Sequence, residues 1–350
     1  MKLFVTGGAG FIGSHFICHA LESNRNYSVV NYDKLTYAAN LANLRTIADD
    51  PQYRFVRGDI CDAVAVEAAM RGCDAVVHFA AESHVDRSIY EPTPVIETNV
   101  TGTFVLLQIA RRVGITRFVH ISTDEVYGDL SPGTFAREGA PLKPSSPYSA
   151  SKAAADLLVL SFVRTYGFPA LVTRSSNNYG PRQFPEKILP LMITNALVDK
   201  PLPVYGDGMQ QRDWLHVDDN CNGILAVLER GRIGEIYNIG GIDVKENLTM
   251  VKRVLRAMGK PETLLAFVKD RPGHDRRYAL DCSKAEGELG WKRMISLDEG
   301  LRRTIEWYGA NPDWLASVNA GEYRSYYEKY YNNRDSSLRA IAPAETKSLH

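Results

Sequence analysis

Short runs of apolar and β-branched residues recur along the first half of the chain, and longer segments with helical spacing separate them. The apolar runs occupy residues 2–6, 28–33, 54–59, 75–80, 117–123 and 170–176. The clearest helical segments between them, each ending at a glycine, are 62–72, 99–114 and 149–167. Continuous apolar strands that alternate with helices are typical of a parallel sheet covered on both faces. The pattern therefore predicts the α/β class with a doubly wound parallel sheet.

The segment after the first apolar run is rich in glycine. In VTGGAGFIGSH, Gly8, Gly10 and Gly13 fit the G-x-G-x-x-G spacing. Gly7, Gly10 and Gly13 fit a G-x-x-G-x-x-G spacing, and both patterns describe the same loop. Between a strand and a helix, glycines let the backbone approach a pyrophosphate that lies at the helix N-terminus. This position favours a dinucleotide-binding loop over an ordinary glycine-rich turn, and the predicted sheet is then of the Rossmann type.

Two carboxylates are placed to contact the adenosine part of such a cofactor. Asp33 ends the second strand about 20 residues after the last glycine, where a carboxylate accepts hydrogen bonds from ribose hydroxyls and repels a 2′-phosphate. This favours NAD, although Lys34 beside it leaves NADP open. Asp59 ends the third strand and is expected beside the adenine, with capping of the next helix as the alternative.

The alternation of strands and helices weakens after residue 177, which predicts a second, smaller lobe. Residues 178–212 are rich in proline, glycine and asparagine, and helical patterns dominate after Gly241. We expect this lobe to cover the carboxyl edge of the sheet and to bind the substrate. The predicted parts are an NAD-binding domain over 1–177 and 213–240, a substrate lobe over 178–212 and 241–330, and a flexible tail over 331–350.

Length and composition narrow the class of protein. The 350 residues suit two lobes, because single cores seldom grow beyond about 250–300 residues. The formal net charge is +0, so no basic excess favours nucleic acid or an anionic membrane as a partner. Five cysteines without CxxC spacing are typical of reduced thiols. The apolar run at the N-terminus is too short for a signal peptide or a membrane span, and we expect a soluble, cytoplasmic protein.

A tyrosine, a lysine and a threonine have a spacing that suits catalysis on an alcohol. Tyr148 and Lys152 lie four residues apart on one face of a predicted helix, and a nearby ammonium stabilises a phenolate. We therefore expect Tyr148 to titrate below its usual pKa of about 10 and to act as a general base. Thr123 at the end of the fifth strand supplies a hydroxyl that faces this pair. Together these groups are suited to removing a proton from a secondary alcohol while a hydride leaves for nicotinamide.

Two adjacent carboxylates, Asp124 and Glu125, follow directly after Thr123. An acidic dipeptide at such a position usually caps a turn or pairs with arginine. In a closed pocket, however, neighbouring like charges push their pKa values apart, so that one carboxyl can stay protonated. The pair is then able to serve as base and acid in one site.

Several motifs together make the chain similar to a known family. They are TGGAGFIGSH, DKLTYAANLANL, HFAAESHVDRSI, STDEVYG, SPYSASKA, NNYGPRQFPEKILP, PLPVYGDG, RDWLHVDD and DRPGHDRRYALD. From Lys2 to about Tyr308 the chain resembles the extended short-chain dehydrogenases/reductases that act on nucleotide sugars, and within them the dTDP-glucose 4,6-dehydratases. Ser175 stands where the family usually has cysteine, and Asn220 stands where histidine is common. Neither departure removes a catalytic group.

The resemblance implies dehydration of dTDP-glucose to dTDP-4-keto-6-deoxyglucose. C4 is oxidised, water is eliminated across C5 and C6, and the hydride returns to C6 with NAD bound throughout. In this scheme Glu125 is the base at C5 and Asp124 is the acid at C6. The implied catalytic residues are Thr123, Asp124, Glu125, Tyr148 and Lys152.

The resemblance also implies the binding residues. Those for NAD are Gly7, Gly10, Phe11, Ile12, Gly13, Asp33, Lys34, Thr36, Asp59, Ile60, Phe79, Ala80, Ala81, Ser83, Thr98, Tyr148, Lys152 and Asn178. Those for the nucleotide sugar are Ser83, His84, Thr123, Asn177, Lys187, Ile188, Pro203, Val204, Tyr205, Arg212, Asn247, Arg271 and His274. Arg212 and Arg271 suit bidentate pairing with a diphosphate, with a solvated loop charge as the alternative, and Tyr205 suits stacking on a pyrimidine.

The family is also implied to form homodimers. The long helical segments 98–114 and 149–167 carry apolar residues around more of their circumference than one sheet contact needs, which favours a seam across a two-fold axis.

Other functions stay open on the residues alone. A nucleotide-sugar 4-epimerase or decarboxylase would need the threonine, tyrosine and lysine but not the acid–base pair. A UDP-glucose 4,6-dehydratase fits the same motifs. A non-catalytic NAD-binding module would be expected to have lost Thr123, Tyr148 or Lys152, and all three are present. No metal site is predicted, because His15 and His19, four residues apart, lack a third ligand.

Overall fold

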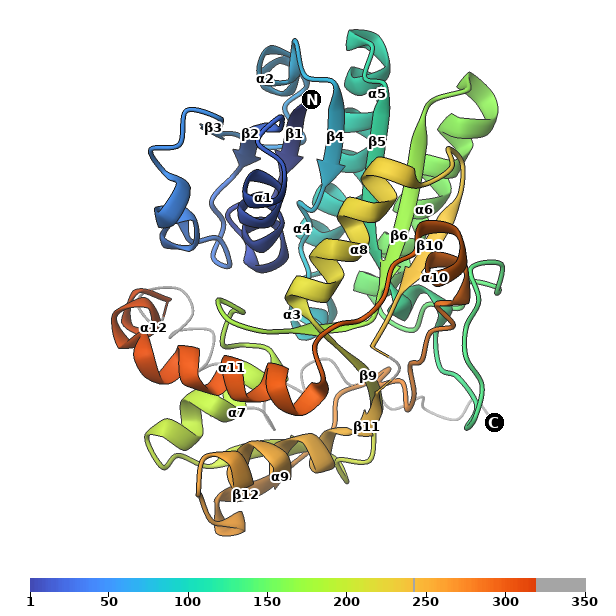
Figure 1. Ribbon diagram of the computed structural model, residues 1–350. Helices are drawn as coiled ribbons and strands as arrows, with labels where there is room; N and C mark the ends of the chain where they lie inside the picture. Colours follow the sequence, from blue (N-terminus) through green and yellow to red (C-terminus); the bar gives the residue numbers. More distant parts are fainter. Residues whose placement is uncertain (242, 319–350) are drawn as a thin grey trace, which may run out of the picture.

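A seven-stranded parallel sheet forms the centre of the larger part of the molecule (Figure 1). The computed structural model describes residues 1–241 and 243–318. The strand order is β10-β6-β5-β4-β1-β2-β3, and every pairing is parallel. The strands are β1 (Lys2–Thr6), β2 (Ser28–Asp33), β3 (Tyr53–Arg57), β4 (Ala75–His78), β5 (Arg117–Thr123), β6 (Ala170–Ser175) and β10 (Ile236–Ile239). The doubly wound sheet predicted from the hydrophobic pattern is confirmed.

Helices cover both faces of this sheet, because its strands present apolar residues on both sides. Leu3 and Val5 of β1 pack on one side, and Phe4 between them packs on the other. The first side is covered by α1 (Phe11–Ser23) and α8 (Val217–Arg230). The second side is covered by α2 (Ala63–Met70), α5 (Thr103–Val113) and α6 (Pro147–Tyr166). The segments α3 (Val85–Tyr90), α4 (Pro92–Ile96) and η2 (Glu97–Gly102) lie in sequence between β4 and α5.

A smaller part with its own core lies at the carboxyl edge of the sheet (Figure 1). Its three-stranded sheet consists of β7 (Asn177–Tyr179), β9 (Gln211–His216) and β11 (Val244–Glu246), and its two-stranded sheet consists of β8 (Leu202–Tyr205) and β12 (Leu265–Val268). Its helices are α7 (Ile188–Leu197), α9 (Asn247–Ala257), α11 (Leu297–Ala310) and α12 (Pro312–Val318). The remaining short elements of the chain are η1 (Leu41–Ile47), η3 (Asp124–Tyr127), η4 (Glu262–Leu264) and α10 (Ser283–Leu289).

The chain crosses between the two parts more often than the sequence pattern indicates. Within 213–240, α8 and β10 pack with the large sheet, whereas residues 213–216 belong to β9 of the three-stranded sheet. Residues 280–291, however, also pack in the large core, through Leu280, Ala285 and Trp291, although the predicted division placed them in the substrate lobe. The reason is that α10 packs on β10 and α8, a contact between distant segments that local periodicity does not reveal. The predicted tail over 331–350 lies outside the described residues.

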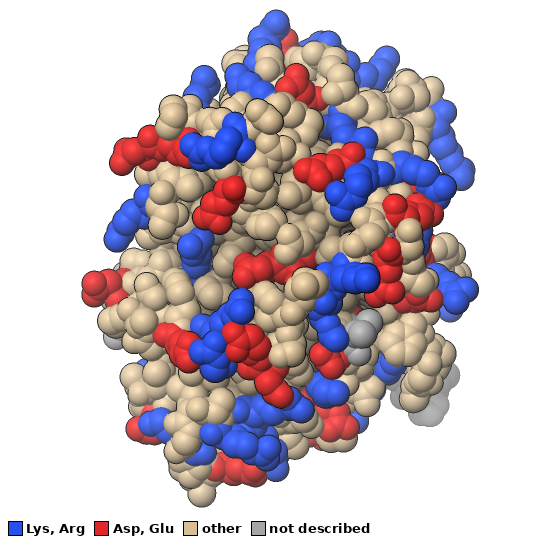
Figure 2. All heavy atoms as spheres, in the orientation of Figure 1, with Lys and Arg blue, Asp and Glu red and all other residues tan. Residues whose placement is uncertain are grey.

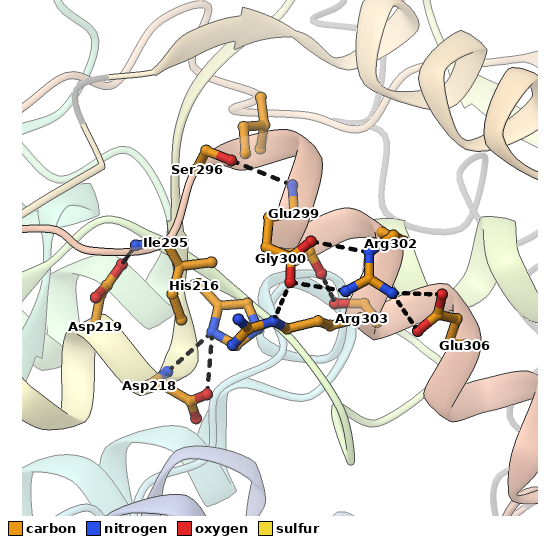
Figure 3. A network of polar contacts seen from close by, with 12 residues as sticks. His216, Asp218, Asp219, Ile295, Ser296, Glu299, Gly300, Arg302, Arg303 and Glu306 are labelled. Atoms are coloured by element: carbon orange, nitrogen blue, oxygen red, sulfur yellow. Dashed lines mark hydrogen bonds and ion pairs between the residues drawn. The ribbon is translucent and has the colours of Figure 1, made fainter.

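Polar contacts join the two parts where α8 meets the segment before α11 (Figure 3). Asp219 of α8 accepts hydrogen bonds from the backbone N–H groups of Met294 and Ile295, at 3.0 and 2.9 Å. His216 caps α8, since its Nδ1 accepts from the Asp218 N–H at 3.3 Å. Gly300 of α11 lies against it, because a Cβ there would come 2.9 Å from His216 Cδ2.

The distribution of charge on the surface agrees with the balanced composition. Acidic and basic side chains are interspersed over most of the face in Figure 2, and the whole chain has a formal net charge of +0. Within the described part of the chain, no helix has the length and apolar character needed to cross a membrane.

Candidate active site

The glycine loop follows β1 and leads directly into α1. Gly7 has a φ of +69°, and a Cβ there would meet the backbone nitrogen of Ala80 at 2.6 Å. A Cβ on Gly13 would come 2.3 Å from the Gly7 carbonyl oxygen, so loop and helix pack too closely for a larger residue. A Cβ on Gly10 would meet only the Gly7 carbonyl oxygen, at 3.3 Å. The backbone at the start of α1 therefore stays accessible, as anion binding at a helix N-terminus requires.

A cavity of about 310 Å³ runs from this loop along the carboxyl ends of β1, β2, β4 and β5. This is the edge at which the strand order reverses on either side of β1, and ligands of open α/β sheets bind there. All the residues predicted to bind NAD line it: Gly7, Gly10, Phe11, Ile12, Gly13, Asp33, Lys34, Thr36, Asp59, Ile60, Phe79, Ala80, Ala81, Ser83, Thr98, Tyr148, Lys152 and Asn178.

Asp33 is held at the edge of this cavity by two backbone groups. Its Oδ2 accepts from the Ala9 N–H at 2.9 Å and its Oδ1 from the Leu35 N–H at 2.8 Å. Burial raises the pKa of this carboxyl, and these two hydrogen bonds oppose the rise. Each oxygen keeps a second lone pair for a ribose hydroxyl.

Lys34 and Asp59, the two charged residues beside Asp33, engage each other. The Lys34 ammonium lies 2.7 Å from Asp59 Oδ2. The side chain that caps α2 is Asp62, which accepts from the N–H groups of Val64 and Ala65. Helix capping by Asp59, the alternative weighed from sequence, is therefore wrong.

Thr123, Asp124 and Glu125 lie where β5 ends and η3 begins. The Thr123 Oγ1 accepts from the Glu125 N–H at 3.3 Å and donates to Asp124 Oδ1 at 3.2 Å. Asp124 is 3% exposed, and its Oδ2 has no hydrogen-bond partner among the described residues. Thr123 is the side chain that caps η3, so turn capping does not account for the two carboxyls.

The two carboxyls lie in different electrostatic surroundings. Burial, Glu125 and Asp213, in that order, raise the pKa of Asp124 well above its usual value. Burial also raises the pKa of Glu125, but three cations oppose this rise: Arg271, Arg212 and Lys187. The surroundings of Asp124 thus favour its protonated form more strongly, whereas the three cations favour the ionised form of Glu125.

Tyr148 and Lys152 lie on the buried face of the first turns of α6. Ser146 and Ser149 form a capping box there and Pro147 is the first helical residue, so the helix start is strongly determined. The Lys152 Nζ donates to the Ile121 carbonyl at 2.7 Å, and burial lowers the pKa of Lys152 to about 8.

The expectation that Lys152 lowers the pKa of Tyr148 below its usual value is wrong for this structure. Burial, followed by the charges of Glu125 and Asp124, raises the pKa of Tyr148, and only a hydrogen bond with Thr123 opposes the rise. The physical reason is that the ammonium is directed to a backbone carbonyl, whereas two carboxyls face the phenol.

The residues predicted for the nucleotide sugar divide into two groups. Ser83, Thr123, Asn177 and Lys187 line the cavity. The others do not line it. His84 lies at the start of α3, and the rest lie on α7, β8, β9, α9 and adjacent loops: Ile188, Pro203, Val204, Tyr205, Arg212, Asn247, Arg271 and His274.

The two predicted arginines are not solvated loop charges. Arg212 is 5% exposed, donates to the Asp275 carbonyl at 2.9 Å and lies 4.4 Å from the centre of the Tyr278 ring. The side chain of Arg271 is 18% exposed. The solvated alternative is therefore wrong, and both guanidinium groups face Glu125.

Other predicted residues have well-defined contacts. His84 caps α3, with its Nδ1 accepting from the Arg87 N–H at 3.2 Å. The rings of Tyr205 and His274 meet edge to face, 6.3 Å apart, and His274 Nδ1 lies 2.6 Å from Asp270 Oδ1. His15, weighed as a metal ligand, instead contacts Asp218 and the Pro181 carbonyl, at 3.2 and 2.9 Å.

Sequence reasoning missed three buried acidic residues close to the site. Glu186 lines the cavity and accepts from the Tyr37 hydroxyl at 3.0 Å. Asp156, on α6, accepts from Arg174 Nε at 2.8 Å in the core. Asp86, on α3, contacts Arg271 and is the third. The sequence did carry a signal for such residues: Arg174 and Asp156 are charged residues inside otherwise apolar strand and helix patterns.

Comparisons with known proteins agree with this geometry. The family described as GDP-mannose 4,6 dehydratase matches residues 4–304. A dTDP-glucose 4,6-dehydratase from Shigella flexneri is 49% identical over 95% of this chain and 100% of that relative. The solved structure of DesIV, a dTDP-glucose 4,6-dehydratase from Streptomyces venezuelae with NAD bound, is 49% identical with a TM-score of 0.89, over 91% of this chain and 100% of that one.

A more distant relative shares the scaffold. The UDP-glucuronic acid 4-epimerase of Bacillus cereus, solved with UDP-glucuronic acid and NAD, is 32% identical with a TM-score of 0.84, over 89% of this chain and 99% of that one. The identity is thus higher to the dehydratases than to this epimerase, over nearly the full length of each. The chain belongs to the dTDP-glucose 4,6-dehydratase family.

Proposed function

We propose that this protein dehydrates dTDP-glucose to dTDP-4-keto-6-deoxyglucose with bound NAD. The observation that carries the proposal is the adjacent pair of Asp124 and Glu125 near Tyr148. Asp124 is buried and its pKa is raised well above the usual value, whereas Glu125 faces three cations. Such a pair is what elimination of water requires and what simple oxidation does not need. The names of the relatives, dTDP-glucose 4,6-dehydratases at 49% identity, support the same reaction.

The residues present fit NAD. The open backbone around Gly10 and the N-terminus of α1 would hold the pyrophosphate, and Asp33 would accept hydrogen bonds from the adenosine ribose. The Asp33 carboxylate would repel a 2′-phosphate. Lys34 pairs with Asp59 and would not offset this repulsion, which favours NAD over NADP. When bound, NAD supplies a positively charged hydride acceptor for C4 and afterwards a hydride donor for C6.

Tyr148 would take the proton of the C4 hydroxyl during oxidation. Because the pKa of Tyr148 is raised, its phenolate is a strong base, but forming the phenolate is unfavourable. A positive charge is therefore needed to stabilise it. With a pKa of about 8, Lys152 is mostly protonated at neutral pH, and its ammonium would supply part of that charge if it turned from the Ile121 carbonyl toward Tyr148. The Thr123 hydroxyl shares a hydrogen bond with Tyr148 and would orient it.

Elimination would follow at the carboxyl pair. Oxidation at C4 makes the C5 hydrogen acidic, and Glu125 would remove it. Asp124, held neutral by its surroundings, would protonate the C6 hydroxyl as it leaves as water. Burial of Asp124, which is 3% exposed, keeps bulk water away from this side of the reactive intermediate.

The nucleotide would bind beyond the cavity, in the smaller part. Arg212 and Arg271 would pair with the diphosphate, and Tyr205 would stack on the pyrimidine. Asn247 begins α9, and its Oδ1 has no hydrogen-bond partner among the described residues, which leaves it for a ligand.

We also propose a homodimer in the cytoplasm. Large apolar side chains are exposed on α5 and α6, among them Phe104 and Leu157 at 38% and 58%. Their position supports a contact between two copies through these helices. All five cysteines are free thiols, which supports a reducing compartment.

The test of the reaction is a panel of nucleotide sugars. The pure protein should convert dTDP-glucose to a product lighter by one water, as seen by mass spectrometry, and should act more slowly on UDP-glucose and GDP-mannose. A product of unchanged mass with inverted C4 would indicate an epimerase, which does not need the acid–base pair. No reaction with any of the three sugars would contradict the proposal.

A further inference from the structure

A buried carboxylate joins the two parts of the molecule on the nucleotide side of the site. Asp86 lies in the first turn of α3 and is 4% exposed. Its Oδ1 accepts from Arg271 Nη1 at 2.7 Å, and its Oδ2 accepts from the Tyr205 hydroxyl at 3.0 Å. Arg271 and Tyr205 both come from the smaller part. One side chain from the large part thus holds two groups across the boundary.

These two partners have roles in the proposed function: Arg271 would bind the diphosphate and Tyr205 would stack on the pyrimidine. A guanidinium as enclosed as that of Arg271 needs a counter-charge, and Asp86 supplies it. The contact uses only Nη1, and Arg271 Nε is buried with no hydrogen-bond partner among the described residues. The planar group is therefore fixed in direction while donors remain for an anionic ligand.

The same segment fixes a second cation. The Lys187 Nζ donates to the Ser83 carbonyl at 2.6 Å, three residues before Asp86. Lys187 and Arg271 are two of the three cations that face Glu125. The segment 83–86 therefore sets the positions of two charges that act on the carboxyl pair.

We propose that Asp86 is a positioning residue of the nucleotide site, which holds Arg271 and Tyr205 in the orientation that receives the diphosphate and the pyrimidine. This inference rests on the proposed function. The competing interpretation is a purely structural role, either as a favourable charge in the first turn of a helix or as an anchor between the two parts. A structural role affects folding stability, whereas a positioning role affects nucleotide affinity.

The substitution Asp86→Asn keeps the shape and one acceptor oxygen but removes the charge that holds Arg271. We expect the dissociation constant for dTDP, measured by calorimetry on the NAD-containing protein, to rise about tenfold, the size of one charge-assisted hydrogen bond. With dTDP-glucose, KM should rise by a similar factor while kcat changes by less than about threefold.

Asp219→Asn is the matched control. Asp219 is also a buried carboxylate that connects the two parts. Among the described residues its side chain accepts only from the Met294 and Ile295 backbones, and it does not line the cavity (Figure 3). This variant should melt at a lower temperature without a change in dTDP affinity. Unchanged dTDP affinity in Asp86→Asn, or an equal loss in Asp219→Asn, would overturn the positioning role.

Tyr205→Phe keeps the ring and removes only the hydroxyl that Asp86 accepts from. Alone it should weaken dTDP binding about threefold, and combined with Asp86→Asn it should weaken binding by less than the product of the two effects. If Asp86→Asn does not fold, unchanged affinity in Tyr205→Phe overturns the inference. Failure of the wild type to dehydrate dTDP-glucose counts against the proposed function alone, since dTDP binding reports on Asp86 without turnover.

Discussion

Asp124 and Glu125 are neighbours in the chain, yet their side chains meet different groups. Asp124 is buried and has two other carboxyls near it, Glu125 and Asp213, and its pKa rises well above the usual value. The pKa of Glu125 rises less because cations from the smaller part face it: Arg271, Arg212 and Lys187. Two residues of the same chemistry can therefore take opposite roles, because a pKa depends on what surrounds the group in space.

We expect substitutions of this pair to separate the chemical steps. Glu125→Gln lacks the base at C5, so it should oxidise the sugar and then stall, with the absorbance of bound NADH persisting. Its turnover should fall by on the order of 100-fold. Asp124→Asn should slow water loss by a similar factor, while the C5 hydrogen still exchanges with deuterated solvent. Stopped-flow absorbance and mass spectrometry measure the two effects. Near-normal turnover in both variants would show that the assigned roles are wrong.

At the scale of elements, the start of α1 and the seam of α8 with α11 depend on close backbone approach. Gly7 lets the loop pack closely on the backbone after β4, and Gly13 lets the first turn of α1 pack closely on the loop. Gly300 lets α11 lie on His216 (Figure 3). Both contacts fix where one element begins relative to another, and each can be tested by one substitution with a control.

Gly7→Ala should abolish retention of NAD. The added Cβ would lie 2.6 Å from a backbone nitrogen at a φ of +69°, so the loop must move. Gly72→Ala is the control, because its φ is +74° but a Cβ there meets nothing within 4 Å. The control should cost about 1 kcal/mol of stability from backbone strain and keep its NAD, measured in the supernatant after denaturation. Equal NAD content in both variants would contradict the assignment of the loop.

His216 should make the protein less stable in acid. Burial lowers its pKa from 6.5 to about 4, so between these values the unfolded chain binds a proton that the folded chain does not. The free energy of unfolding should therefore fall as pH decreases from 6.5 to 4, by on the order of 3 kcal/mol from this group. In His216→Asn, the free energy of unfolding measured in urea at each pH should depend less steeply on pH than in the wild type. An unaltered slope in His216→Asn would refute this.

At the scale of the whole molecule, the two parts are tied together by buried polar groups as well as by packing. Asp86 connects α3 to Arg271 and Tyr205, and Asp219 connects α8 to the segment before α11. The proposed catalytic groups come from the large part, and most of the residues proposed to contact the nucleotide come from the smaller one, so the proposed site is complete only when both are in place.

Self-association is predicted at the same scale. We expect a dimer at micromolar concentration in light scattering, with α5 and α6 of two copies in contact. Leu157→Arg places a charge in this surface and should give a monomer, whereas Val64→Arg on α2, at 81% exposure, should stay dimeric. A monomeric wild type, or a dimeric Leu157→Arg variant, would argue against this interface.

The order of residues alone determined the parallel sheet, the glycine loop after β1, and Asp33 and Asp59 as carboxylates beside the cofactor. These features follow from periodicity and short spacing, because a strand-to-helix turn places its own residues at the edge of the sheet. The resemblance added most of the other residues along the cofactor cavity and those of the smaller part, which no local pattern identifies.

Only the tertiary structure decided the features that depend on contacts between distant segments. The pKa of Tyr148 rises because the fold buries the phenol and brings Glu125 and Asp124 close to it, although the spacing to Lys152 favoured the opposite. Residues 280–291 join the large core because α10 packs on β10. Asp86 resembles an ordinary helix-start charge until folding brings Arg271, 185 residues away, to its carboxylate. Electrostatics and packing act over distance in space, which linear order does not encode.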